Sequence, residues 1–317
     1  MKPFWQGVFP AVTTQLKRDQ ALDLDATARH LEVLIGSGVN GLIMLGSLGE
    51  NQALDPDEKR RVVALSVEVA HGRVRVLSGV AETSTAAACR YVRDCERLGV
   101  DGFMLMPGML YKGDPRETMA HLRAVAAATH LPIMIYNNPI SYANDVTPEM
   151  FAILADVKNF VALKESSGDP RRLTDLRRVV GGRYALFTGV DDLLLESAVL
   201  GIDGWVAGAG IAFPLENQYL WDLTRRGDWA RAREVYRWFT PLLHLDTHVK
   251  FVQYIKLAVQ ECGLGAEWVR APRRPLVGAE RTRVLQIIHH GMKTRPKLPA
   301  PLARRHKPGA LASGPAR

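Results

Sequence analysis

The stretch Pro132–Lys164, PIMIYNNPISYANDVTPEMFAILADVKNFVALK, contains the two runs that decide the fold. Pro132–Tyr136 (PIMIY) and Phe160–Lys164 (FVALK) are apolar almost throughout. Runs of this kind are typical of strands that are buried on both faces of a parallel sheet. The longer stretch between them provides the crossover that two parallel strands require.

The same alternation repeats along the chain at spacings of roughly thirty residues, and it predicts an α/β fold, a closed (β/α)8 TIM barrel. An open doubly wound sheet usually carries a phosphate loop, but neither GxGxxG nor GxxxxGK[ST] follows a strand here, so no nucleotide cofactor is expected. The other predicted strands are Gly7–Thr13, Gly41–Leu45, Val74–Val80, Gly102–Met106, Tyr184–Thr188 and Gly204–Ala207. Helical patterns between the strands include Leu24–Gly36, Asp57–Ala70, Thr85–Leu98 and Arg116–Thr129, and the eighth helix is expected near Leu215–Thr224.

More helix follows than a plain barrel needs. We therefore expect residues 1–227 to form the barrel and residues 228–292 to form a small C-terminal helical domain. The Pro-rich segment 293–317 is predicted to be a disordered tail. The helices expected after the barrel are Trp229–Leu243, His248–Cys262 and Glu280–Met292.

The positive charge of the chain is concentrated in that tail. The net charge is +8, and residues 293–317 carry seven basic residues and no acidic ones, so the rest of the chain carries 8 − 7 = +1. A nearly neutral folded part without a binding motif predicts no nucleic-acid partner.

Membrane insertion and disulfide chemistry are not expected either. Every apolar window is interrupted by glycine or a charged residue, and the N-terminus has no long apolar segment of the kind found in signal peptides. The three cysteines, Cys89, Cys95 and Cys262, form no CxxC pair, so neither a disulfide nor a metal site is predicted, and the expected location is cytoplasmic.

Lys164 is the first candidate for chemistry, because barrel enzymes place their active sites at the C-terminal ends of the strands. A lysine that closes an apolar strand is desolvated, which lowers its pKa and supplies the neutral amine that Schiff-base formation requires. The alternative is a structural ion pair with an acid such as Glu165.

Two neighbouring features favour the catalytic interpretation. Tyr136 ends the preceding strand, so its phenol can move protons beside the amine, although an aromatic core residue is the alternative. The turn Gly46-Ser47-Leu48-Gly49-Glu50 presents backbone N–H groups that suit a carboxylate, and the Ser47 hydroxyl could pass a proton to Tyr136, although a plain strand–helix connection is the alternative.

These motifs, together with Tyr136-Asn137-Asn138-Pro139, Phe160–Gly168 and Gly189–Asp192, resemble the dihydrodipicolinate synthase / N-acetylneuraminate lyase family from about Trp5 to about Met292. The resemblance implies a barrel with a C-terminal helical domain, usually a homo-oligomer (tetramer or dimer), that acts on a small-molecule 2-oxo acid without cofactor or metal. It also implies site roles. Lys164 is the Schiff-base nucleophile, Tyr136 is the proton shuttle, and Ser47 and Leu48 hold the substrate carboxylate, while the pocket is lined by Gly189, Asp191 and Val206.

Departures from the family pattern bear on the substrate. Ser141 stands where the synthase that makes dihydrodipicolinate has an arginine, Met109 stands where it lends a tyrosine to the neighbouring subunit, and Leu48 replaces a hydroxyl residue. A thioether cannot carry a proton relay. Tyr111 is a candidate to replace that tyrosine but is displaced in register, and another residue is the alternative. The synthase reaction is therefore disfavoured.

YNNP, the segment Asp145–Glu149, KESSGD and HVKFVQYIKLA look most like the branch of Δ1-pyrroline-4-hydroxy-2-carboxylate deaminases. The expected substrate is a cyclic imine, and Asn138 is expected either to contact it or to satisfy the loop before Pro139. A 2-oxo-acid aldolase that releases pyruvate is the alternative, and a non-catalytic ligand-binding barrel is a remoter one.

Overall fold

The computed structural model describes residues 4–108 and 110–299, and within them eight parallel strands form one sheet in the order β1-β8-β7-β6-β5-β4-β3-β2. The remaining edges meet through a parallel bridge between Ala11 and Ile43, where Val12 N donates to Ile43 O at 2.9 Å, so the sheet closes into the expected barrel. The strands are β1 (Gly7–Val8), β2 (Gly41–Met44), β3 (Arg75–Val80), β4 (Gly102–Leu105), β5 (Ile133–Asn137), β6 (Phe160–Glu165), β7 (Ala185–Thr188) and β8 (Gly204–Trp205).

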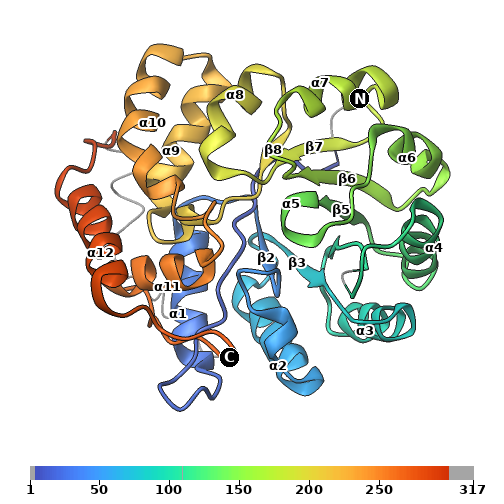
Figure 1. Cartoon of the computed structure of the whole chain (residues 1–317), viewed down its shortest axis with the longest axis horizontal. Coiled ribbons are helices and arrows are strands. Elements are labelled where there is room, and N and C mark those ends of the chain that lie inside the picture. Colours follow the sequence, from blue (N-terminus) through green and yellow to red (C-terminus); the bar gives the residue numbers. More distant parts are fainter. Residues whose placement is uncertain (1–3, 109, 300–317) are drawn as a thin grey trace, which may run out of the picture.

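Helices surround the barrel on the outside (Figure 1). They are α1 (Leu24–Gly36), α2 (Pro56–Ala70), α3 (Thr85–Arg97), α4 (Pro115–Ala126), α6 (Pro148–Ile153), α7 (Arg171–Val180), α8 (Leu194–Val199) and α9 (Pro214–Arg226). Shorter segments in the connections are η1 (Asn51–Ala53), α5 (Pro139–Tyr142), η2 (Leu154–Asp156), η3 (Asp191–Leu193) and η4 (Ala209–Ile211).

The C-terminal helical part consists of α10 (Trp229–Leu243), α11 (Phe251–Glu261) and α12 (Gly278–Lys293). It lies at one side of the barrel, where α10 packs against α9 (Figure 1). Helices therefore follow the barrel as expected. Of the segment predicted to be a disordered tail, residues 300–317 lie outside the described residues, as does Met109. No helix of the described part is long and apolar enough to cross a membrane.

Local sequence signals explain where several helices begin. Asp114 and Glu117 form a capping box around the start of α4, and Pro115 occupies its first turn. The Asp23 carboxylate accepts a hydrogen bond from Ala26 N at the start of α1, and Ser84 caps α3 in the same way. These caps satisfy backbone N–H groups that have no partner within the helix.

The strand expected over Gly7–Thr13 is shorter in the structure. Pro10 has no N–H to give to a regular ladder, and the chain beyond it bonds to its two neighbours in turn. Ala11 N donates to Ala207 O at 2.8 Å and Val12 N to Ile43 O at 2.9 Å. The segment still closes the barrel, although only Gly7–Val8 forms a regular strand.

Aromatic side chains fill the barrel near the start of its strands. The rings of Phe9 and Phe187 pack edge to face with centroids 5.4 Å apart. A Cβ atom on Gly41 would lie 2.2 Å from the Phe9 ring, and one on Gly204 would lie 2.1 Å from the Phe187 ring. Because these rings occupy the interior at this end, open space remains at the C-terminal ends of the strands.

Candidate active site

A cavity of about 630 Å³ opens at the C-terminal ends of the strands. Its walls come from the turns that follow β2, β5, β6, β7 and β8 and from the connection between α10 and α11. Of the predicted site residues, the ones that line it are Ser47, Leu48, Tyr136, Asn138, Lys164, Gly189 and Val206.

Lys164 lies on β6 directly opposite Tyr136 on β5, because the two residues are paired in the register of the parallel strands. Its Nζ atom lies 3.9 Å from the centroid of the Tyr136 ring. Burial lowers the pKa of Lys164 from its ordinary value, although nearby Tyr142, Asp246 and Asp191 act in the opposite direction. A buried amine with a lowered pKa has the neutral fraction that nucleophilic attack needs.

The ion pair with Glu165 that served as the alternative for Lys164 is not formed. The Glu165 carboxylate accepts hydrogen bonds from Ser167 N at 2.6 Å and Asn137 Nδ2 at 3.1 Å. Successive side chains of a strand point to opposite faces, so Lys164 faces the cavity while Glu165 faces away from it. The Lys164 amine therefore forms no ion pair with Glu165 and faces the cavity, where it can react with a substrate.

Gly189 makes room for the lysine. A Cβ atom at this position would lie 2.1 Å from Lys164 Cε and 2.3 Å from Ser166 Oγ. Ser166 lines the same cavity, and its buried hydroxyl has no hydrogen-bond partner among the described residues. Ser166 was not singled out from the sequence, although it lies two residues after Lys164, the spacing at which side chains of a strand share a face.

Asn138 orients Tyr136. Its Nδ2 donates to the Tyr136 hydroxyl at 3.0 Å, while its Oδ1 accepts from Ser141 N at 3.0 Å at the start of α5. The same amide thus satisfies the loop before Pro139 and holds the phenol. Burial raises the pKa of Tyr136, so the phenol keeps its proton near neutral pH.

The glycine turn after β2 presents Ser47 and Leu48 to the cavity. Among the described residues, neither backbone N–H donates a hydrogen bond to another residue. Such free amides in a fixed turn are suited to a substrate carboxylate. The Ser47 hydroxyl is hydrogen-bonded to the hydroxyl of Tyr142.

Tyr142, which the sequence analysis did not single out, belongs to this group. It is the last residue of α5, where its N–H donates to Asn138 O at 3.0 Å. Its ring packs edge to face against Tyr136 with centroids 5.7 Å apart. An asparagine cap followed by Pro139 is a helix-start signal, and it could have placed Tyr142 one turn away, above the Tyr136 strand end.

Asp246, in the connection between α10 and α11, was also missed. Its carboxylate lies in the cavity over Gly208, where a Cβ atom would lie 2.1 Å from Asp246 Oδ1. Burial raises the pKa of Asp246 well above its ordinary value, and the negative charge of Asp191 adds to the shift. The C-terminal helical part thus contributes an acid to a cavity that the barrel strands form.

Gly49 and Asp191 lie outside the cavity lining. The Asp191 carboxylate accepts hydrogen bonds from Trp205 Nε1 at 2.9 Å and Ala209 N at 2.6 Å, and so it holds the turn after β8. Burial raises the pKa of Asp191 to about 6. Gly49 packs against the backbone of Leu45, where a Cβ atom would lie 2.9 Å from Leu45 N.

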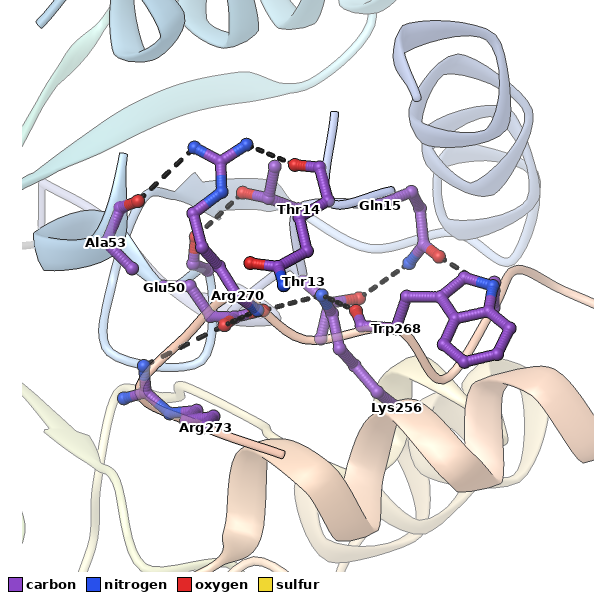
Figure 2. A network of polar contacts seen from close by, with 12 residues as sticks. Thr13, Thr14, Gln15, Glu50, Ala53, Lys256, Trp268, Arg270 and Arg273 are labelled. Atoms are coloured by element: carbon purple, nitrogen blue, oxygen red, sulfur yellow. Dashed lines mark hydrogen bonds and ion pairs between the residues drawn. The ribbon is translucent and has the colours of Figure 1, made fainter. Parts of the chain in front are cut away.

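A buried ion pair joins the glycine turn to the C-terminal helical part (Figure 2). Lys256 Nζ lies 2.6 Å from Glu50 Oε1 and 2.6 Å from Trp268 O, and both charged side chains are fully buried. Arg270 N donates to Glu50 Oε2 at 2.9 Å. The cavity wall on this side therefore depends on residues from both parts of the chain.

Comparison with known proteins agrees with this geometry. The model of the dihydrodipicolinate synthetase family matches residues 4–291. The 4-hydroxy-tetrahydrodipicolinate synthase of Phenylobacterium zucineum is 31% identical over 290 residues, which cover 90% of this chain and 97% of that protein. The corresponding protein of Methanospirillum hungatei is 29% identical, over 84% of this chain and 93% of that one.

Solved structures give the same result. The 4-hydroxy-tetrahydrodipicolinate synthase of Methylacidiphilum fumariolicum superimposes with a TM-score of 0.88 at 26% identity, over 95% of this chain and 99% of that one. YagE, a prophage protein of the dihydrodipicolinic acid synthase family from E. coli K12 in complex with pyruvate, gives a TM-score of 0.84 at 27% identity, over 91% and 99% of the chains. The chain belongs to the dihydrodipicolinate synthetase family, whose members are Schiff-base lyases.

Proposed function

We propose that Lys164 forms a Schiff base with a 2-oxo acid or its cyclic imine, and that the physiological reaction is the deamination of Δ1-pyrroline-4-hydroxy-2-carboxylate. The observation that carries the first part is the buried Lys164 amine, free of its neighbouring acid and 3.9 Å from the ring centroid of a tyrosine held by Asn138. The related YagE structure contains pyruvate, which is a 2-oxo acid.

The deamination begins with ring opening. Lys164 Nζ adds to C2 of the imine, the C2–N bond of the ring breaks, and both protons that the lysine amine gives up end on the ring nitrogen. The product is an open-chain Schiff base with a free amine at C5. Asp246 supports this step because its raised pKa keeps a proton available for the departing nitrogen.

Elimination follows. The protonated Schiff base acidifies C3, Tyr136 takes the C3 proton as it passes its own phenolic proton on, and the 4-hydroxyl leaves with a proton as water. Tautomerisation turns the C5 amine into an imine. Hydrolysis of both imines then releases 2-oxoglutarate semialdehyde and ammonia and restores Lys164. The net reaction consumes a single water molecule.

The polar groups of the cavity support this substrate over the pair used by a dihydrodipicolinate-forming synthase. Ser141 lines the cavity where those synthases have an arginine, so the turn after β5 supplies no cation for a second carboxylate, and the arginine that does line the cavity, Arg273, is paired with Glu50 at 3.8 Å. Asp246 faces the same space, and a carboxyl group suits the amine that ring opening creates. The hydroxyl groups of Ser47 and Tyr142 could donate hydrogen bonds to the 4-hydroxyl of the substrate as it leaves.

Cleavage of a 4-hydroxy-2-oxo acid to pyruvate is the second candidate. Its Schiff base and proton transfer would use the same Lys164 and Tyr136, and the pyruvate in the YagE structure favours it. The synthase reaction of the curated relatives is a third possibility, which the same assay tests.

Borohydride reduction with each 2-oxo acid, followed by peptide mass spectrometry, tests the Schiff base. We expect an adduct on Lys164 in the wild type and none in Lys164→Ala, whereas Lys158→Ala, altered at an exposed lysine, should react normally. Absence of any adduct would instead support a non-catalytic binding barrel.

The reaction is identified by its products. Purified enzyme is incubated separately with Δ1-pyrroline-4-hydroxy-2-carboxylate, with 4-hydroxy-2-oxoglutarate, and with pyruvate plus aspartate semialdehyde. Ammonia release from the first is the expected result. Release of pyruvate from the second, or condensation in the third mixture with no ammonia from the first, would contradict the deaminase assignment.

A further inference from the structure

Tyr142 connects two residues of the site, Ser47 and Tyr136, which share no hydrogen bond with each other among the described residues. Its hydroxyl is hydrogen-bonded to Ser47 in the turn after β2, and its ring packs against Tyr136 at the end of β5. Tyr142 is partly buried and lines the cavity that contains Lys164. A tyrosine hydroxyl that is hydrogen-bonded to a serine hydroxyl can both donate and accept a proton.

Tyr111 does not occupy such a position. Its side chain is 61% exposed, its hydroxyl donates to Glu117 Oε1 at 3.0 Å, and it is absent from the cavity lining. Met109 lies outside the described residues. Within the part of the chain that the structure describes, Tyr142 is therefore the tyrosine placed to work with Tyr136 of the same subunit.

We propose that Tyr142 is the second tyrosine of the proton relay and that it acts within its own subunit. The relay runs from Tyr136 through Tyr142 to Ser47, and all of its members come from the chain that carries Lys164. This inference rests on the proposed Schiff-base function, and it holds for either a deaminase or an aldolase.

The relay moves protons without building up charge. In the deaminase, Tyr136 accepts a proton from C3 while its phenolic proton passes to Tyr142, the Tyr142 proton passes to Ser47, and the Ser47 proton passes to the departing 4-hydroxyl. In aldol cleavage the same path runs in reverse, from the 4-hydroxyl to C3, and with pyruvate the proton taken from C3 exchanges with solvent. Burial raises the pKa values of both phenols, so each starts protonated near neutral pH. A chain of neutral hydroxyls is therefore the resting state.

Proton transfer by the relay and formation of the Schiff base can be measured separately with pyruvate, by proton exchange at C3 and by borohydride trapping. The enzyme is incubated with pyruvate in D2O, exchange is followed by NMR, and borohydride trapping is measured in parallel. Tyr142→Phe keeps the ring but removes the hydroxyl, and we expect it to slow exchange about 100-fold while trapping reaches the wild-type extent. Tyr111→Phe removes the hydroxyl of the alternative relay tyrosine and should change neither exchange nor trapping; slowed exchange in Tyr111→Phe with normal exchange in Tyr142→Phe would overturn the proposal.

Additional variants address a structural role. Ser47→Ala should also slow exchange, and the double variant should be little slower than Tyr142→Phe alone, because both changes interrupt one path. Exchange in Tyr142→Phe within twofold of the wild type, or loss of trapping together with exchange, would overturn the relay role. Failure of wild-type enzyme to trap pyruvate would contradict the proposed function itself, and this inference with it.

Mixed oligomers test whether the relay is internal to the subunit. Lys164→Ala and Tyr142→Phe chains are co-expressed with different tags, and doubly tagged complexes are assayed for exchange. If the relay is internal, each site in such a complex lacks one of the two residues: sites of one chain lack Lys164, and sites of the other lack the Tyr142 hydroxyl. No activity above that of Tyr142→Phe is therefore expected. Recovery of activity in the mixed complexes would show that Tyr142 serves a neighbouring subunit and would overturn the proposal.

Discussion

Lys164 and Tyr136 are directly paired across the adjacent parallel strands β6 and β5, and the lysine Nζ lies 3.9 Å from the centroid of the tyrosine ring. Side chains of paired residues project to the same face of the sheet. In a closed barrel that shared direction is the interior, so a nucleophile and a proton-transfer group meet in one cavity as a consequence of strand register. The pairing explains why these side chains can act on one substrate.

The pH dependence of Schiff-base formation should reflect the lowered pKa of Lys164. The neutral amine is the reactive form, so the trapping rate with pyruvate should rise with pH through the Lys164 pKa and then level off. The plateau should begin below the pH at which an exposed lysine loses its proton. A rate that still rises in parallel with ordinary lysine titration would contradict this prediction, which stopped-flow mixing followed by borohydride quenching measures.

Replacement of Asp246 should shift the same profile. In its ionised form Asp246 raises the pKa of Lys164, so at pH values where Asp246 has lost its proton Asp246→Asn should lower that pKa and move the rising limb toward lower pH. The variant should also lose about 100-fold in the rate of ammonia release, because it no longer donates a proton to the ring nitrogen. Trapping of pyruvate, which has no such nitrogen, should be retained at the pH plateau.

Asp222→Asn provides the control for charge removal, since Asp222 accepts a hydrogen bond from Gln218 on α9 and does not line the cavity. It should leave both the pH profile and ammonia release unchanged. Equal losses of ammonia release in the two variants would show that Asp246 has no specific role.

Gly189→Ala should displace the nucleophile while the fold is retained. The added Cβ would lie 2.1 Å from Lys164 Cε, and the flexible lysine is the group that must move. Misplacement of a reacting group by about 1 Å can reduce the rate about 100-fold. We expect a decrease of that order in the trapping rate, whereas Gly182→Ala, with nothing near its Cβ position, should behave as wild type. Near-UV circular dichroism checks that both variants are folded.

The buried pair of Glu50 and Lys256 should be important for stability when only one member is removed. Lys256→Met leaves Glu50 without its main partner in a fully buried position, and loss of about 3–5 kcal/mol in the free energy of unfolding is expected. The double variant Glu50→Gln/Lys256→Met should lose less than the sum of the single changes, because no unpaired charge remains. Denaturant unfolding at neutral pH measures all three.

A surface pair serves as the comparison for this cycle. Arg231 and Glu234 form an ion pair on α10 with side chains that are 40% and 60% exposed. Removing Arg231 should change the free energy of unfolding by no more than about 1 kcal/mol. A similar small effect for Lys256→Met would mean that the network in Figure 2 contributes little.

The sequence by itself determined the barrel and its two central residues. Hydrophobic periodicity is a local property, and it predicted α1 and α10 with the observed ends and most strands to within a residue or two. Lys164 and Tyr136 could be identified because strand ends in a parallel barrel always meet at one rim. Their positions in the site thus follow from short stretches of sequence and a general rule of topology.

Only the tertiary structure decided how the rest of the cavity is completed. Ser47 and Tyr142 are separated by 95 residues, and the Asp246 carboxylate meets Gly208 through packing of the C-terminal helical part on the barrel. Asp191, expected in the pocket wall, is instead held by Trp205 and Ala209 beneath it. Such contacts depend on how loops of different units pack together, and no periodicity or motif within a single segment specifies that packing.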